Sequence, residues 1–226
     1  MKKFALILAI LLAFSLVGCT AQNPPPTEPT EEVDVIWGKI KTAVNEYNSS
    51  EYLHLSLYVT NEDIHEIDLQ TTPKVSEYWI WGETCYVEVY SNGKWKPHTF
   101  DHEGYSYLSS GENQWRVTGN DSDGYDVTID LPGGKSSLAD WMEIDGQLEA
   151  VLKTEDGSGT LWLDADGKLL WFTMASEGYT IDGEGQRIPT ILHWILVYND
   201  TAEQQIKQTV ETVIANMEIL EHNAEP

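Results

Sequence analysis

The chain has 226 residues, with 37 Asp or Glu against 13 Lys or Arg, so its formal net charge is −24. Nucleic-acid binding needs clustered Lys and Arg that displace counterions, so this charge argues against a nucleic-acid partner and against electrostatic docking to an anionic membrane. Hydrophobic residues make up 41% of the chain and aromatic residues 11%, which favours a folded core over a disordered acidic tail.

The N-terminus has the layout of a secretory signal. Lys2 and Lys3 precede the unbroken apolar run from Phe4 to Phe14, which is shorter than the roughly 20 residues of a membrane-spanning helix. The next segment, Leu16-Val17-Gly18-Cys19, resembles the lipobox of bacterial lipoproteins. The resemblance implies that residues 1–18 are a lipoprotein signal peptide and that Cys19 becomes the diacylglyceryl-modified first residue of the mature chain. An ordinary secretory signal with a chance cysteine is the alternative.

A polar tether is predicted after the cysteine. Residues 19–32 end in TAQNPPPTEPTEE, which contains four prolines and no large apolar side chain. At roughly 3 Å per residue, such a segment holds a domain tens of ångströms from the lipid. We therefore expect a protein anchored by lipid to the extracytoplasmic face of a cell membrane. Residues 33–226 are expected to form a single β-rich domain.

Cys85 is the second of the two cysteines in the chain. If Cys19 carries lipid, Cys85 has no intrachain disulfide partner. It alternates with Val87 and Val89 in TCYVEVY, which is the pattern of a strand with one apolar face. The sequence therefore predicts a small buried side chain here rather than a reactive thiol.

Helices are predicted at both ends of the domain. In the segment that begins at Val33, apolar residues recur at helical spacing. The C-terminal segment from Asn199 to Leu220 has a longer apolar stripe, and Thr201 and Gln204 have the spacing of a capping box. The apolar positions of the two helices are Ile36, Ile40, Val44 and Tyr47 in the first, and Ile206, Val210, Val213, Ile214, Met217 and Leu220 in the second.

Between the helices the period changes to two. In EYLHLSLYV, Leu53, Leu55 and Leu57 fall on one face, which predicts a half-buried strand. Similar runs, including HEIDLQ, recur as far as TILHWILVY, and turn dipeptides such as Asn92-Gly93 and Asp145-Gly146 separate them. In SSLADWMEI a single helical turn is expected. The pattern predicts an α+β fold dominated by an antiparallel meander.

The order of helix, long antiparallel sheet and second helix behind a lipobox resembles the lipoprotein-carrier (LolA-like) half-barrels. The stretch from Gly159 to Asp200, GTLWLDADGKLLWFTMASEGYTIDGEGQRIPTILHWILVYND, resembles their late hairpins in its strand, Asp/Gly turn, apolar strand and longer loop. The resemblance implies a strongly curved sheet with helices across its concave side, around an apolar cavity.

The strands LLWFTMA and ILHWILVY are apolar on both faces. A sheet with one solvated face would alternate, so these strands are either covered on both sides or line a cavity. The first alternative is a core packed by the terminal helices, and the second is a pocket for a lipid or another apolar molecule. Candidate ligand-binding residues in strand-like runs are Trp79, Trp81, Trp171 and Trp194.

Motifs for catalysis or cofactor binding do not stand out in the sequence. His98 and His102 would lie about 13 Å apart along a strand, too far for one metal ion. In the acidic stretch NDSDGYDVTID, a calcium-loop register that fits Gly124 places Gly119 at the first ligand position. We therefore expect no metal, no cofactor and no enzymatic activity.

Two functions remain open at this point. In the first, the protein is a membrane-anchored, non-enzymatic lipoprotein that binds a lipid or other apolar ligand in a half-barrel. In the second, it is a surface-recognition module that binds cell-wall glycan or an envelope protein through exposed aromatic residues such as Tyr86 and Tyr90.

Replacing Cys19 with serine tests the anchor. Without the thiol no acyl chain can be attached, so Cys19→Ser is expected to abolish lipidation and leave unprocessed precursor, measured by intact mass and by partition into detergent. A variant that matures normally and still enters the detergent phase contradicts the assignment.

Overall fold

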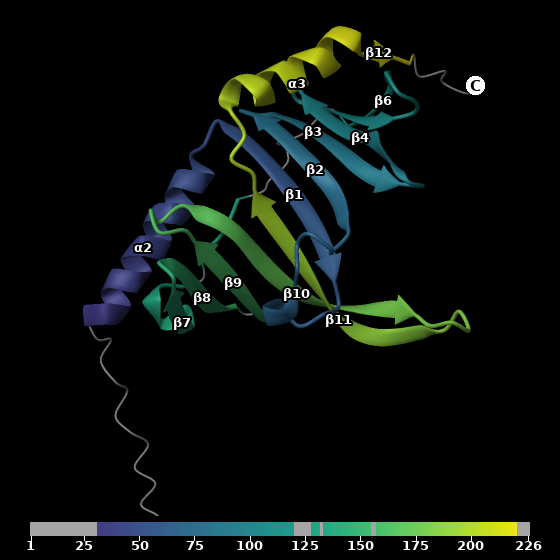
Figure 1. Ribbon diagram of the computed structural model, residues 1–226. Helices are drawn as coiled ribbons and strands as arrows, with labels where there is room; N and C mark the ends of the chain where they lie inside the picture. Colours follow the sequence, from purple (N-terminus) through teal and green to yellow (C-terminus); the bar gives the residue numbers. More distant parts are fainter. Residues whose placement is uncertain (1–30, 120–127, 132, 155–156, 221–226) are drawn as a thin grey trace, which may run out of the picture. The chain divides into compact units, whose positions relative to one another are not determined.

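The computed structural model describes residues 31–119, 128–131, 133–154 and 157–220 (Figure 1). The chain divides into two units, Met1–Val35 and Ile36–Pro226, and the sheet belongs to the second. The predicted signal peptide, Cys19 and the tether as far as residue 30 lie outside the described residues.

The described residues form two α-helices and one twelve-stranded sheet. The helices are α2 (Glu31–Asn48) and α3 (Glu203–Asn216). The strands are β1 (Tyr52–Thr60), β2 (Lys74–Trp81), β3 (Thr84–Ser91), β4 (Lys94–His102), β5 (Tyr105–Ser109), β6 (Gln114–Gly119), β7 (Leu138–Ile144), β8 (Gln147–Thr154), β9 (Gly157–Leu163), β10 (Leu169–Ile181), β11 (Arg187–Tyr198) and β12 (Glu218–Ile219).

The strand order is β12-β6-β5-β4-β3-β2-β1-β11-β10-β9-β8-β7. Every pairing between neighbours is antiparallel except the short parallel pairing of β12 with β6. Two meanders, β1 to β6 and β7 to β11, therefore meet where β1 pairs with β11. The sheet is open within the described residues and its strands curve visibly in Figure 1, so the predicted antiparallel α+β fold is confirmed and is consistent with a half-barrel.

Two-residue turns set the register of several hairpins. Asn92 and Gly93 have φ angles of 54° and 79°, and Asp145 and Gly146 have 53° and 80°. Left-handed backbone at both central positions matches the twist of the flanking strands, and Asn, Asp and Gly tolerate it best. Both turns therefore occur where these dipeptides predict them.

The first helix packs on one face of the sheet, here called the α2 face. Leu53 and Leu55 of β1 and Ile80 of β2 lie in the cluster that contains the buried side of α2. Strands β8, β9 and β10 contribute most of the remaining apolar residues to the same cluster. The buried residues on the helix side are those of the predicted stripe, Ile36, Ile40, Val44 and Tyr47, together with Ala43.

The second helix packs on the opposite face, here called the α3 face. Side chains next to each other along a strand point to opposite faces, so Trp79 and Tyr86 face away from Ile80 and Cys85. Ile206 and Val210 of α3 lie in one cluster with these two aromatic residues and with Phe100, Tyr107 and Trp115. This arrangement differs from the one implied by the lipoprotein-carrier resemblance, because the helices cover opposite faces instead of sharing the concave one.

Local hydrogen bonds explain where the described elements depart from the predicted ones. The run HEIDLQ forms a short 3₁₀ helix and a turn, because Asp68 accepts hydrogen bonds from the backbone N–H groups of Gln70, Thr71 and Thr72. Such local bonds compete with a strand ladder. The helical turn expected in SSLADWMEI is wrong: a 3₁₀ turn at Lys135–Ser137, with Gly134 as its N-cap, ends where it was expected to begin, and Leu138–Ile144 form β7. Helix α3 ends at Asn216, before the last two residues of the predicted stripe.

Ile40 tests the packing of α2. Its side chain is fully buried, so Ile40→Ala removes contacts from the α2 face and leaves a void. The expected loss is about 2–5 kcal/mol of unfolding free energy, measured by chemical denaturation. Thr42→Ala, at an exposed position of the same helix, is the matched control and should change stability by less than about 0.5 kcal/mol. Equal effects at both positions would contradict the packing.

Candidate functional site

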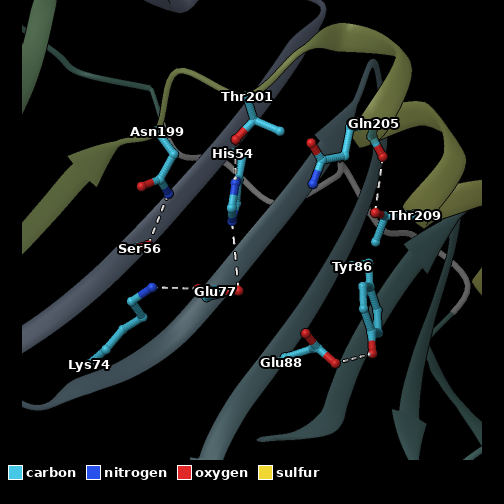
Figure 2. Close-up of polar contacts among 10 residues, drawn as sticks. All are labelled: His54, Ser56, Lys74, Glu77, Tyr86, Glu88, Asn199, Thr201, Gln205 and Thr209. Atoms are coloured by element: carbon cyan, nitrogen blue, oxygen red, sulfur yellow. Dashed lines mark hydrogen bonds and ion pairs between the residues drawn. The ribbon is translucent and has the colours of Figure 1, made fainter.

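A cluster of charged and polar side chains lies on the α3 face, across β1 and β2 (Figure 2). Nε2 of His54 lies 3.7 Å from a carboxylate oxygen of Glu77, and Nζ of Lys74 lies 2.6 Å from the other oxygen. His54 and Lys74 together hold the pKa of Glu77 down at about 2, with His54 the larger influence, although partial burial acts in the opposite direction. The carboxylate therefore stays ionised near the core because two cationic or proton-donating groups flank it.

Two side-chain hydrogen bonds join the connection between β11 and α3 to β1 (Figure 2). Nδ1 of His54 and the Thr201 hydroxyl are 2.8 Å apart, and the amide of Asn199 donates to the Ser56 hydroxyl at 2.9 Å. The predicted capping box of Thr201 and Gln204 is therefore wrong. Ala202, which has no side-chain acceptor, occupies the N-cap position of α3, and the Thr201 hydroxyl bonds to His54 instead.

Stacked rings continue this cluster into the apolar core beneath α3. The His54 ring lies on the indole of Trp79 with ring centroids 3.6 Å apart and planes 14° from parallel. Farther along the sheet, Tyr86 meets Phe100 and Trp115 edge to face, with centroids 6.4 Å and 6.3 Å away. Edge-to-face contacts of this kind add to the stability gained from burial alone.

A cavity of about 770 Å³ opens beside these rings, between the second half of α3 and strands β3 and β4. We call it the α3 cavity. Three aromatic side chains, Tyr86, Trp95 and Trp115, share its wall with polar and charged groups of both signs. The lining residues are Tyr86, Glu88, Lys94, Trp95, Lys96, Pro97, Ser109, Ser110, Gly111, Glu112, Asn113, Trp115, Thr212, Val213 and Asn216.

Tyr86 and Glu88 form the most buried polar pair of this wall. The Tyr86 hydroxyl donates to the Glu88 carboxylate at 3.0 Å (Figure 2). Burial raises the pKa of Glu88 above its usual value, and burial next to this carboxylate raises the pKa of Tyr86 as well. The tyrosine is therefore neutral at physiological pH and orients the carboxylate toward the cavity side of β3. Apolar rings with a few fixed polar groups are typical of small-molecule sites.

The four tryptophans predicted as ligand residues are not gathered in one place. Trp79 is buried under His54, and Trp81 stacks on Tyr52 with Lys207 of α3 4.8 Å from its ring. Trp171 stacks on Trp162 at 3.7 Å, and the indole N–H of Trp194 donates to Ser176. Among the described residues, neither this cavity nor the one below is lined by any of the four, so their role in binding stays a prediction.

The sequence analysis did not single out Trp95 and Trp115, which do line the α3 cavity. Trp95 stands between two lysines in KWKPHTF, and Trp115 stands in QWRVTG. A tryptophan between two lysines is unusual in a chain this acidic. This pattern could have indicated Trp95 as a candidate ligand-binding residue, because it places an apolar ring beside basic groups. The burial of Trp115 could not be predicted from the local sequence, because the helix that covers it, α3, lies near the other end of the chain.

A second cavity, of about 370 Å³, lies at the end of α2. Tyr47 of the helix and Leu169 of β10 form part of its apolar floor, while Glu46, Asp164 and Asp200 are at its margin. One carboxylate oxygen of Asp164 already accepts hydrogen bonds from two backbone N–H groups of the turn between β9 and β10, so this oxygen serves the turn and not a ligand in the cavity.

Cys85 is buried on the α2 face, as its alternation with valines predicts. Burial, together with the nearby Asp101 carboxylate, raises the pKa of its thiol far above the usual value. Within the described residues, no three His, Cys, Asp or Glu side chains converge as metal ligands. None of the helices described is both long and apolar enough to cross a bilayer.

No family model matches this chain, and no curated protein matches it by sequence. Among solved structures, the crystal structure of the Mycobacterium tuberculosis lipoprotein LppX is similar to it, with a TM-score of 0.41 and 11% sequence identity. The match covers 75% of this chain and 97% of that one. A likeness of this size concerns the arrangement of strands and helices in general, and the function proposed below does not rest on it.

Glu77 makes stability depend on pH. Its pKa is lower in the folded protein than the ordinary 4.5, so the ionised form stabilises the fold. This stabilisation is complete above about pH 4.5 and is lost as the pH falls toward 2. Allowing for solvent screening, Glu77→Gln is expected to cost about 1–3 kcal/mol at pH 7 and much less near pH 2, measured by denaturation at each pH.

The matched control is Glu83→Gln, at an exposed turn position between β2 and β3. It should leave unfolding free energy nearly unchanged at both pH values. A loss from Glu77→Gln that is the same at pH 2 and pH 7 would show that the carboxylate is not held by His54 and Lys74.

Proposed function

We propose that this protein is a lipid-anchored, non-enzymatic binding protein on the extracytoplasmic face of a cell membrane, and that it holds an amphipathic ligand in the α3 cavity. The observation that carries the proposal is the cavity itself, with Tyr86, Trp95 and Trp115 on one wall and charged groups at its margin. Its volume of about 770 Å³ falls in the range of small-molecule sites. The signal-like N-terminus and the Cys19 lipobox support the membrane anchor.

The shape of the site supports a ligand with both apolar and polar parts. Trp115 is almost fully buried and Trp95 is partly exposed, so the aromatic wall runs from the core to the surface. An acyl chain or another apolar body would lie along this wall and remove the Trp95 ring from water, while Trp115 would contact it from the core side. Its polar end would meet Lys94, Lys96 and Glu112 at the margin. The proposed ligand role of Trp79 and Trp81 is then indirect, because they support α3 from the same face of the sheet.

One observation favours a second candidate, the recognition of cell-wall glycan. Tyr90 and Trp95 are both exposed on the surface, with ring centroids 5.4 Å apart and planes tilted by 59°. A pair of exposed rings beside amides and hydroxyls suits stacking on sugars as well as it suits an apolar chain. The two candidates use the same Trp95, so the test has to separate them by ligand.

Filling the α3 cavity tests the first candidate. Thr212→Trp places an indole in the cavity from the α3 side, so we expect a fluorescent long-chain fatty acid used as probe to bind roughly tenfold more weakly or worse. Native mass spectrometry after mild extraction should show a co-purifying apolar ligand in the wild type and less of it in the variant. Glu211→Trp, at the preceding residue of α3, which is not on the cavity wall, is the matched control.

The second candidate has its own outcome. Glycan recognition is supported instead if the protein carries no ligand in native mass spectrometry and sediments with purified peptidoglycan. In that case Trp95→Ala should abolish the sedimentation with peptidoglycan. A protein that is empty, does not bind the fatty acid and does not sediment would contradict both.

A further inference from the structure

The hairpin of β10 and β11 extends beyond the rest of the sheet (Figure 1). Strand β9 pairs with β10 only between Leu169 and Met174, and β1 pairs with β11 only from His193 onward. Within the described residues, the strand segments 175–181 and 187–192 therefore pair only with each other. We call residues 175–192 the arm. Each of its strands presents an outer edge of backbone N–H and C=O groups that no described strand occupies.

One face of the arm is mainly apolar and exposed, and the other carries one exposed isoleucine. Directly opposed residues of an antiparallel pair share a face, so Tyr179 and Pro189 lie on one side with Ile181 and Ile191, while Ile188 lies on the other. The exposed fractions of Tyr179, Ile181, Ile188 and Ile191 are between 46% and 66%. The second face also holds Ser176, Thr180 and Thr190, so it is the face of Tyr179 and Ile191 that is apolar and uncovered. An exposed apolar face of this kind is typical of a surface that another molecule covers.

The arm is held rigid by its own contacts. At its tip, Asp182 accepts the backbone N–H groups of Glu184 and Gln186, which fixes the turn. Along the strands, Leu192 lies across Gly178 so closely that a Cβ there would come within 2.5 Å of it. The arm is thus preformed, and an occupant would not have to order it on binding.

Charge selects the occupant. The arm carries Glu177, Asp182 and Glu184 against one cation, Arg187, whose guanidinium lies 4.3 Å from the Tyr179 ring. A second copy of a chain with net charge −24 would repel it, and an anionic bilayer would repel the acidic tip. We propose that the arm is a docking element for a protein partner that offers an apolar cleft bordered by Lys and Arg. Alternate side chains would fill the cleft while a free edge of the arm accepts a partner strand.

Site-specific photocrosslinking in the organism's own cells tests the proposal with the full-length protein. The probe is benzoylphenylalanine, placed by Ile181→benzoylphenylalanine in the arm and by Ile219→benzoylphenylalanine at another exposed isoleucine, on β12. We expect a protein adduct from position 181 and none from position 219. Adding Glu177→Lys and Glu184→Lys should lower the yield at position 181 by roughly fivefold or more, because attraction to a basic rim becomes repulsion.

The double lysine variant should keep the thermal midpoint and the fatty-acid affinity of the wild type, since neither residue belongs to the core clusters or to the α3 cavity. A failure of the ligand proposal would therefore leave this test intact. The docking proposal is overturned if the adduct joins two differently tagged copies of this protein or contains lipid. It is also overturned if both positions give equal adducts, if neither gives one, or if the two lysines leave the yield unchanged.

Discussion

Apolar burial on both faces of β1, β2 and β3 is the constraint on which the rest of the molecule depends. Leu53, Leu55 and Ile80 need cover on one side of the sheet, and Trp79 and Tyr86 need it on the other. One helix cannot reach both faces, so α2 and α3 are distributed one to each. Helix α3 packs most closely on β1, β2 and β3, and the α3 cavity lies between its second half and the strands that follow.

The polar cluster around His54 decides where α3 begins. The Thr201 hydroxyl bonds to His54 and Asn199 bonds to Ser56, so the chain leaving β11 is held against β1 before the first helical turn. Glu77, flanked by His54 and Lys74, keeps its charge close to the aromatic core. The helix that this cluster holds at its start also supplies Thr212 and Val213 to the wall of the α3 cavity.

Short-range pattern predicted much of the fold and little of the site. Alternation in EYLHLSLYV and the Asn92-Gly93 turn depend on neighbouring residues, so β1 and the β3–β4 hairpin were readable. The apolar spacing of Ile206 and Val210 likewise predicted a helix that covers a sheet face. The bond between His54 and Thr201 joins residues 147 positions apart. Thr201 and Gln204 have the spacing of a capping box, and no local rule shows that the Thr201 hydroxyl bonds elsewhere. The run HEIDLQ had strand-like composition, but the hydrogen bonds of Asp68 outweighed it.

The pairing of β1 with β11 has a consequence for how the chain assembles. All other strand pairs of the two meanders close over short stretches of sequence, whereas Leu55 opposes Tyr198 across most of the domain. The entropy lost on closing a loop rises with its length, and non-local pairings slow folding. The hairpins of each meander can thus form from local contacts, whereas the pairing of β1 with β11 requires the two meanders to come together. Because β11 leads directly into α3, closing this pairing also brings α3 to β1, β2 and β3, where it forms one wall of the α3 cavity.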